Sequence, residues 1–254
     1  MIAATDIDLR LGANDVLSGA RLRTRPGQVV GLIGPNGSGK SSLLRCLYGM
    51  LRPNGGAVLI SDTPIESLSR RSIARAVGVV TQDAAADGIG ITVGEFVLLG
   101  RHVHRGDHQR FTAEDRRITL DALDLVDMAD FAERNLQELS GGERQRVMIA
   151  RCIAQQSPVM LLDEPTNHLD VRYQHEVLTL VQNLDMDTIV VLHDLNLSSR
   201  YCHHLVLLDQ GKVVRQGPPK EVLRSEVLEP VYGIEVRRLV DGPHSYLAFG
   251  PIAS

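Results

Sequence analysis

The sequence lacks several features that would place it in a particular class of protein. No apolar run approaches the ~18–20 residues that a membrane-spanning helix needs, so we expect membrane association only through another protein. Acidic residues outnumber basic ones by 31 to 27, a balance that argues against a nucleic-acid partner. Internal repeats and low-complexity linkers are missing, and we expect no signal peptide because the N-terminus alternates polar and apolar residues.

Cysteine is also scarce. The three cysteines, Cys46, Cys152 and Cys202, are odd in number and widely spaced without a CxxC pair, which fits a reduced cytoplasmic setting. The chain has 254 residues, of which 43% are hydrophobic and 23% charged. This size and composition predict one large domain, or one domain with an inserted subdomain.

The most informative segment is a glycine-rich loop at residues 34–42 that matches G-x-x-x-x-G-K-[ST]. Its members are Gly34, Pro35, Asn36, Gly37, Ser38, Gly39, Lys40, Ser41 and Ser42. The apolar run 29–33 before it is typical of a buried parallel strand, and a helical pattern begins at Ser42. Backbone N–H groups at the start of such a helix attract phosphate. We therefore predict a nucleoside-triphosphate site, with Lys40 at the β- and γ-phosphates and Ser41 on Mg²⁺.

Further motifs follow the loop in a distinctive order. They are Leu-Ser-Gly-Gly-Glu at 139–143, an apolar run ending in Asp163 and Glu164, the segment 167–170, and an apolar run followed by His193 and Asp194. Gln82 comes directly after a further run, 77–81. Together with the phosphate loop, this set resembles the ATP-binding cassette (ABC) family, and the resemblance covers nearly the whole chain.

The resemblance implies an α/β fold: a P-loop NTPase core with a mostly parallel sheet, an antiparallel β subdomain and an inserted α-helical subdomain. We expect a single ABC nucleotide-binding domain over 1–254. Its parts would be an ATP-binding core (1–87 and 156–225), a helical subdomain with the signature motif (88–155) and a C-terminal extension (226–254). Local patterns add detail: Thr92 and Thr112 are predicted helix caps, residues 209–212 a hairpin turn, and 234–236 and 246–249 edge strands.

The resemblance also implies roles for individual residues. Asp163 is expected to hold Mg²⁺ opposite Ser41, and Glu164 to act as the general base for the water that attacks the γ-phosphate. His193 is expected to hydrogen-bond the γ-phosphate, although a lone histidine after a strand is usually structural. Gln82 is expected to contact the metal or the water. Without the family resemblance, an ordinary glutamine in a loop would explain this residue equally well.

The Leu-Ser-Gly-Gly-Glu segment occurs once, and so does the phosphate loop. In the family this segment completes the nucleotide site of a second cassette, so Ser140, Gly141 and Gly142 are expected to contact the γ-phosphate across a dimer. Ser140 and Glu143 also form the pattern of a capping box, and both interpretations can hold together. Asp170 is expected at the subunit boundary, although it also fits a simple N-cap. A homodimer that closes around two Mg-ATP is the simplest expectation.

Leu11 departs from the family pattern. It stands where an aromatic residue usually stacks on the adenine, and such stacking is worth roughly 1–3 kcal/mol per base. We therefore predict weaker or less base-selective ATP binding than in relatives that carry the aromatic residue.

The wider function is inferred from the resemblance alone. A single cassette without membrane spans resembles the energy-coupling ATPases of bacterial importers, and the segments 100–104, 163–170 and 231–236 resemble the branch for iron–siderophore, haem and cobalamin. The expected partners are a second cassette, an integral membrane permease, and a periplasmic or lipoprotein substrate-binding protein that acts through the permease. The expected location is peripheral, on the cytoplasmic face of the plasma membrane.

Other functions remain as alternatives at this point. A soluble ABC ATPase that acts on a non-membrane partner, such as an iron–sulfur assembly scaffold, has the same motifs. A phosphate-loop kinase or GTPase would leave the Ser-Gly-Gly segment and His193 unexplained. The spacing of His102, His104 and His108 fits a solvated loop next to a partner better than a metal cluster, because no cysteine or carboxylate set completes a site.

Overall fold

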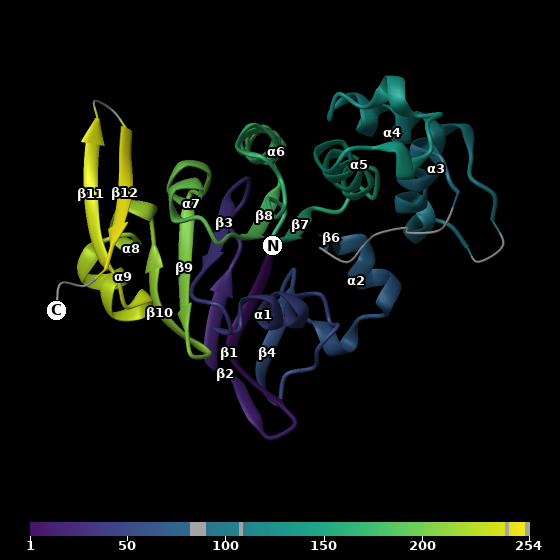
Figure 1. Ribbon diagram of the computed structural model, residues 1–254. Coiled ribbons are helices and arrows are strands. Elements are labelled where there is room, and N and C mark those ends of the chain that lie inside the picture. The colour runs from purple at the N-terminus through teal and green to yellow at the C-terminus, as the bar shows by residue number, and fades with distance from the viewer. Residues whose placement is uncertain (82–89, 107–108, 242–243, 252–254) are drawn as a thin grey trace.

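The computed structural model of the protein describes residues 1–81, 90–106, 109–241 and 244–251, and its centre is a six-stranded sheet (Figure 1). The strand order is β10-β9-β3-β8-β7-β6. The strands are β3 (Val29–Ile33), β6 (Val77–Val80), β7 (Val159–Asp163), β8 (Asp187–Val191), β9 (His204–Asp209) and β10 (Lys212–Gly217). All pairings are parallel except that of β9 with β10, which are joined by the predicted hairpin turn.

A second, antiparallel sheet has the order β2-β1-β4-β5. Its strands are β1 (Ile2–Leu11), β2 (Asn14–Arg23), β4 (Gly55–Ile60) and β5 (Thr63–Pro64). It lies below the central sheet in Figure 1. The prediction of a mostly parallel sheet with a separate antiparallel β part is therefore confirmed.

Both faces of the central sheet are covered. On β3, Val29 and Ile33 belong to the core shared with the helices α6 (Val171–Asn183) and α7 (Leu195–Tyr201). Val30 and Leu32 point the other way, into the core shared with α1 (Lys40–Leu47) and the antiparallel sheet. This two-sided burial explains why the strand is apolar at every position rather than at alternate ones.

A helical segment, residues 93–154, lies beside the β6 edge of the sheet at the upper right of Figure 1. It contains α3 (Val93–Leu98), η2 (Leu99–His104), α4 (Ala113–Asp124), η3 (Ala129–Phe131), η4 (Leu136–Glu138) and α5 (Gly141–Ala154). η1 (Ile65–Ser67) and α2 (Arg70–Ala76) connect the antiparallel sheet to β6. Thr92 and Thr112 form capping boxes with Glu95 and Asp115, as predicted.

The η2 turn differs from the expected solvated loop. The Arg101 side chain is buried, and its Nε lies 3.1 Å from Oδ1 of Asp115, which is itself fully buried. Nε2 of His104 lies 2.8 Å from the backbone carbonyl oxygen of Gln155. His108 lies outside the described residues. Arg101 is therefore a core residue that holds η2 to α4, and it is not available to a partner.

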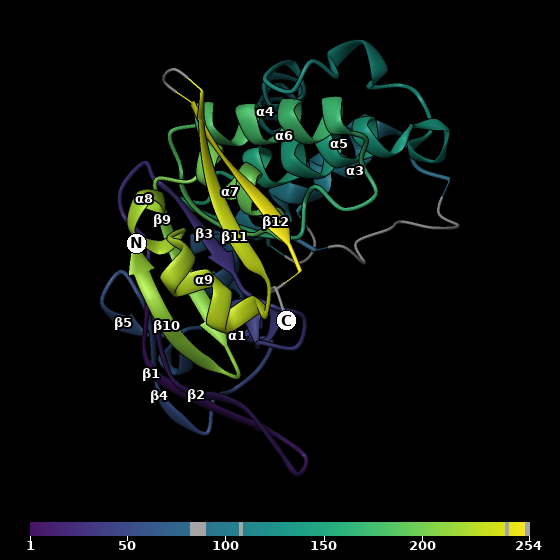
Figure 2. The same cartoon turned by 60° about the vertical axis from the view of Figure 1, so that its left-hand side comes forward.

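The C-terminal part consists of α8 (Pro219–Val222), α9 (Ser225–Tyr232) and a hairpin of β11 (Glu235–Asp241) with β12 (His244–Gly250). Figure 2 shows this hairpin in front of α7. Asn196 of α7 attaches it: Asn196 Nδ2 donates to the Leu247 carbonyl at 3.1 Å, and the Leu247 N–H donates to Asn196 Oδ1 at 2.7 Å. The predicted C-terminal strands therefore exist, and they pair with each other.

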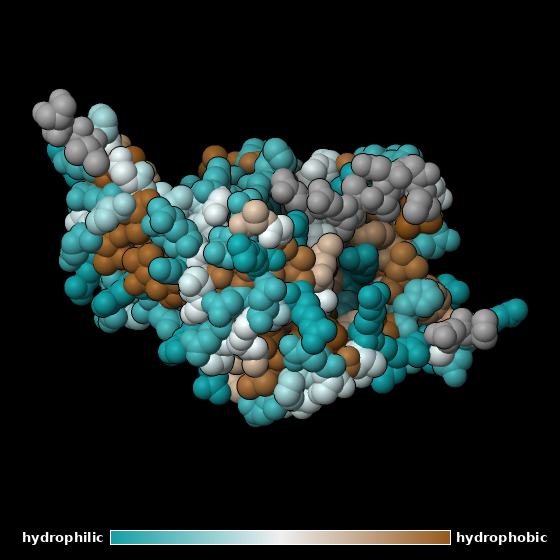
Figure 3. Space-filling model, turned by 90° about the horizontal axis from the view of Figure 1, so that it is seen from below, coloured by the Kyte–Doolittle hydropathy of each residue, from teal (hydrophilic) through white to brown (hydrophobic). Residues whose placement is uncertain are grey.

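None of the helices in the part of the chain that the structure describes is long and apolar enough to cross a membrane. Seen from below, the surface is largely hydrophilic, with apolar areas on the side of α8, α9 and β10 (Figure 3). Val214 of β10 is 47% exposed.

Candidate nucleotide site

The phosphate loop connects β3 to α1 as predicted. Gly34 must be glycine, because a Cβ there would lie 2.0 Å from the Leu208 carbonyl oxygen. Gly39 has a φ of 102°, a left-handed conformation that favours glycine, and serves as the N-cap of α1. Ser38 is 3% exposed, and its Oγ has no hydrogen-bond partner in the structure. A buried hydroxyl without a partner at the start of a helix fits a ligand that supplies an acceptor.

Lys40 lies under the same loop. Its Nζ donates to the carbonyl oxygens of Gly34 at 2.9 Å and Pro35 at 2.8 Å. Burial lowers the pKa of Lys40, while the nearby carboxylates of Glu164 and Asp163 act in the opposite direction. The ammonium group is thus held in the loop by neutral carbonyl groups.

Asp163 faces the loop from the end of β7. Ser41 Oγ donates to Asp163 Oδ1 at 3.0 Å, although the two residues are 122 positions apart in the chain. Burial raises the pKa of Asp163, the hydrogen bond from Ser41 opposes this shift, and the charge of Glu164 adds to it. A hydroxyl and a carboxylate oxygen therefore meet beside the N-terminus of α1.

Glu164 follows Asp163. Its backbone φ is 53°, in the left-handed region, which is strained for a residue other than glycine. One carboxylate oxygen lies 2.5 Å from Nε2 of His193, and the other accepts a hydrogen bond from Nδ2 of Asn167. β7 and β8 are neighbouring parallel strands, so the residues that follow them meet at one edge of the sheet. Glu164 and His193 therefore meet as residues that follow neighbouring strands, and neither this contact nor the contact with Asn167 was predicted.

The Leu-Ser-Gly-Gly-Glu segment forms the N-terminus of α5. The predicted capping box is present: Ser140 Oγ donates to Glu143 Oε2 at 2.7 Å, and the Ser140 N–H donates to the same oxygen at 2.8 Å. These hydrogen bonds lower the pKa of Glu143. Ser140 and Gly141 are exposed, whereas Gly142 is buried against the ring of Tyr173, where a Cβ would come within 2.8 Å of ring carbons. No local sequence pattern predicts this contact.

The remaining predicted site residues lie apart from this cluster. Asp170 is the N-cap of α6 and accepts a hydrogen bond from the Tyr173 N–H at 3.0 Å, as the simple N-cap interpretation requires. Leu11 ends β1 with 44% of its surface exposed. Asn36 and Gly37 are exposed at the crest of the phosphate loop. Gln82 lies outside the described residues.

One further residue touches the loop from the C-terminal part. Tyr232, the last residue of α9, forms a hydrogen bond with the backbone of Gly34. Burial raises the pKa of Tyr232 to about 12, and the hydrogen bond partly offsets this shift. Tyr232 entered the prediction only as part of the segment 231–236. Nothing local in the sequence links it to Gly34, which lies 198 positions earlier in the chain (232 − 34).

A phosphate loop that faces an adjacent Asp and Glu, a histidine that follows the neighbouring strand, and a separate helix that starts with Ser-Gly-Gly together define an ATP-binding cassette. The family model described as ABC transporter matches residues 17–167, and the chain belongs to this family. The predicted ABC ATPase is thereby confirmed.

Several relatives are named as import or transport ATP-binding proteins. The chain is 41% identical over 244 residues to the hemin import ATP-binding protein HmuV of Pseudomonas entomophila, covering 93% of this chain and 94% of that protein. It is 35% identical to the iron(3+)-hydroxamate import ATP-binding protein FhuC of Bacillus subtilis, covering 94% and 90%. It is 38% identical to the cobalamin import ATP-binding protein BtuD of Halobacterium salinarum, but spans only 58% of that protein's length.

Solved structures give the same result for the fold. A chain from an inward-facing structure assigned to a metal-chelate type ABC transporter superposes with a TM-score of 0.84 at 25% identity, covering 99% of this chain and 97% of that chain. The dimeric bacterial ABC transporter cassette MJ0796 superposes with a TM-score of 0.73 at 28% identity, covering 86% and 99%. The resemblance to the iron–siderophore, haem and cobalamin branch that the sequence motifs indicated is confirmed.

Proposed function

We propose that this protein is the ATP-hydrolysing, energy-coupling subunit of an ABC importer for an iron–siderophore, haem or cobalamin. The observation that carries the proposal is the meeting of Ser41, Asp163, Glu164 and His193 at one edge of the sheet, beside the phosphate loop. The import functions named for relatives at 35–41% identity support the choice of cargo.

In this proposal the loop residues 34–42 bind the ATP phosphates, and Lys40 turns from the loop carbonyls toward the β- and γ-phosphates. Glu164 is the general base, because its carboxylate is oriented by two hydrogen-bonding neighbours, His193 and Asn167. His193 also donates to the γ-phosphate. Gln82 completes the site by contacting the metal or the attacking water.

The residues present fit a magnesium ion. The Ser41 hydroxyl and the Asp163 carboxylate are hard oxygen ligands only 3.0 Å apart, and Mg²⁺ in ATPase sites is held by one or two such protein groups plus phosphate and water. Mg²⁺ would neutralise charge on the β- and γ-phosphates. Asp163 and Ser41 are therefore the proposed ligands.

The second half of the site comes from another cassette. Among the described residues, no hydrogen bond joins Ser140, Gly141 or Gly142 to the phosphate loop of the same chain, and Ser140 and Gly141 are exposed. We propose that these residues close on the γ-phosphate of a partner copy, with Asp170 at the boundary, and that hydrolysis releases the pair. A related cassette is dimeric.

The other proposed partners are an integral membrane permease and a periplasmic or lipoprotein substrate-binding protein that acts through it. The protein would be peripheral, at the cytoplasmic face of the plasma membrane. Purification from detergent-solubilised membranes, with partners identified by mass, tests this assembly. Recovery of a polytopic permease supports it, whereas recovery only with a non-membrane partner favours the scaffold-assembly ATPase.

Glu164→Gln tests the site itself. Glutamine keeps the size and one of the two acceptor oxygens but cannot take a proton, so the variant should bind ATP, lose hydrolysis and accumulate as an ATP-bound dimer. Light scattering with ATP and Mg²⁺ measures the dimer, and turnover is expected to fall by about 10²-fold or more. Lys40→Ala is the matched control, which should neither bind ATP nor dimerise. A Glu164→Gln variant with full turnover would refute the assignment of the base.

A further inference from the structure

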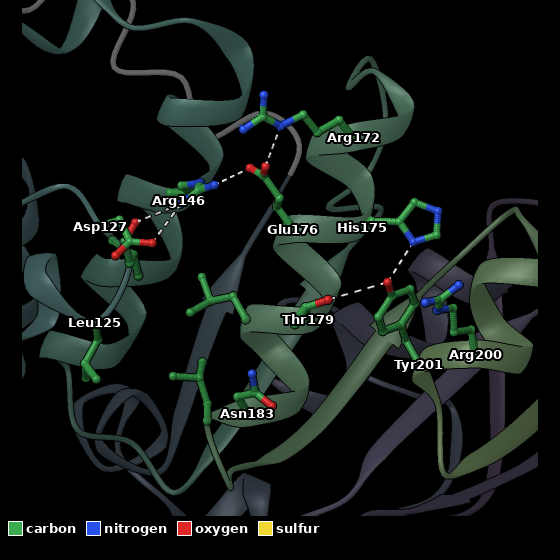
Figure 4. A pocket seen from close by; sticks show the side chains of 13 residues that line it. Leu125, Asp127, Arg146, Arg172, His175, Glu176, Thr179, Asn183, Arg200 and Tyr201 are labelled. Carbon is green, nitrogen blue, oxygen red and sulfur yellow. Dashed lines mark hydrogen bonds and ion pairs between the residues drawn. The ribbon is translucent and has the colours of Figure 1, made fainter.

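A large open pocket lies away from the nucleotide site, between α5, α6, α7 and the end of α4 (Figure 4). Its volume is ≈ 950 Å³, whereas the next described pocket holds ≈ 360 Å³. Small-molecule sites range from roughly 300 to 1,000 Å³ and combine apolar walls with a few polar groups that fix orientation. The pocket therefore has the size of a ligand site, and the nucleotide reaction does not use it.

One wall carries an ionic network that is already paired. Arg146 of α5 contacts Glu176 of α6, and its Nη1 lies 3.4 Å from Oδ2 of Asp127. Arg172 Nε also donates to Glu176 Oε1, at 2.7 Å. Two arginines are thus matched by two carboxylates, so this wall is close to neutral and is held in place across α5 and α6.

Arg200 adds an unmatched positive charge at the α7 end. Its guanidinium lies 5.8 Å from the centre of the Tyr201 ring, and among the described residues it has no carboxylate within ion-pair distance. Figure 4 shows Arg200 beside His175 and Tyr201. His175 Nδ1 bonds to the Tyr201 hydroxyl at 2.7 Å, which leaves Nε2 without a protein partner in the described structure.

The rest of the lining is mostly apolar, with Thr179 and Asn183 as its polar members. Leu125 at the end of α4 is 58% exposed, and it lines the pocket together with Val126, Leu180 and Leu184. Figure 4 places Leu125 at the opposite end of the pocket from Arg200. Arg200 thus gives the α7 end a positive charge, and Leu125 gives the α4 end an apolar surface beside the paired Asp127 and Arg146.

We propose that this pocket binds a small amphipathic anion, with a carboxylate or phosphate head at Arg200 and His175 and an apolar tail toward Leu125. A charge-assisted bidentate hydrogen bond from Arg200 would hold the head, since planar anions match the guanidinium group. The tail would cover Leu125, which is otherwise exposed to water. The bound molecule would contact both the helical segment and the sheet core.

The experiment measures binding of octanoate and octyl phosphate to the full, nucleotide-free chain by calorimetry, with 1-octanol as the neutral probe. Wild type should bind at least one of the two anions. Arg200→Gln should weaken that binding by about tenfold, the value of one hydrogen bond to a charged group. Arg200→Lys, which keeps the charge, should retain part of the affinity. The matched control is Arg215→Gln, which removes an exposed arginine of β10 that does not line the pocket.

Leu125→Asp tests the other end, because a carboxylate there should repel the ligand and expose its tail. Both altered side chains are at the surface, so folding is expected to survive, and circular dichroism checks this. The proposal is overturned if wild type binds neither anion at millimolar concentration, or if Arg200→Gln binds as tightly as wild type. It is also overturned if Arg215→Gln weakens binding as much as Arg200→Gln does. None of these results bears on ATP hydrolysis.

Discussion

Gly142→Ala is expected to destabilise the protein even without nucleotide. A Cβ at Gly142 would lie 2.8 Å from Cδ1 and Cγ and 3.2 Å from Cε1 of Tyr173. These atoms include Cγ, at the base of a rigid ring, and the Tyr173 N–H donates to Asp170, which fixes the backbone from which the ring projects. Overpacking of this kind costs about 1–3 kcal/mol. Part of this is offset because alanine favours a helix over glycine by up to about 1 kcal/mol.

Thermal unfolding of the nucleotide-free protein measures the effect. For a chain of this size, each kcal/mol corresponds to a Tm change of about 2–4 °C. Gly141→Ala is the matched control, because the nearest atom to its Cβ is Leu169 Cδ2 at an ordinary 3.7 Å, so its Tm should not fall. Both variants should lower ATPase activity if both glycines approach a γ-phosphate, but only Gly142→Ala should lower the Tm.

A double-mutant cycle completes the test. Tyr173→Leu removes the ring, so Gly142→Ala should cost less in that background than in wild type, giving a coupling energy of about 0.5–3 kcal/mol. Two results would refute the conclusion that the Tyr173 ring requires glycine at position 142. One is an equal Tm for the two alanine variants, and the other is strictly additive effects of Gly142→Ala and Tyr173→Leu.

Three further predictions concern other parts of the chain. Burial raises the pKa of Asp115, but hydrogen bonds from arginines and Thr112 outweigh it and hold the pKa below its ordinary value. Asp115→Asn should therefore cost about 3 kcal/mol in urea unfolding at pH 7, because Arg101 is left buried without its counter-charge. Since the pKa is depressed, this gap should persist down to about pH 4 and shrink only below it; a gap that closes near neutral pH would contradict the account. Asn196→Ala should speed hydrogen exchange in residues 244–251 by freeing the Leu247 backbone, with unchanged exchange in β3 as the internal control. Leu11→Tyr should tighten ATP binding by about tenfold, and an unchanged Kd would show that Leu11 is not the base platform.

Local structure was predictable wherever neighbouring residues determine it. The strand–loop–helix unit at 29–47, the capping boxes at Thr92, Thr112 and Ser140, and the turn at 209–212 all depend on residues within a few positions of one another. The family motifs also predicted that Asp163, Glu164 and His193 belong to one site. Each lies at or just after the end of an apolar strand, and the carboxyl ends of parallel strands meet at one edge of the sheet.

The sequence by itself therefore determined the class of protein, the phosphate loop and the order of the catalytic candidates along the chain. Only the tertiary structure decided which distant residues meet: Tyr173 against Gly142, Asn167 on Glu164, Tyr232 on the loop, and Arg101 buried on Asp115. The physical reason is that burial and close contact depend on how helices and strands pack. Such packing joins segments that are far apart in the chain, so local sequence patterns do not predict it.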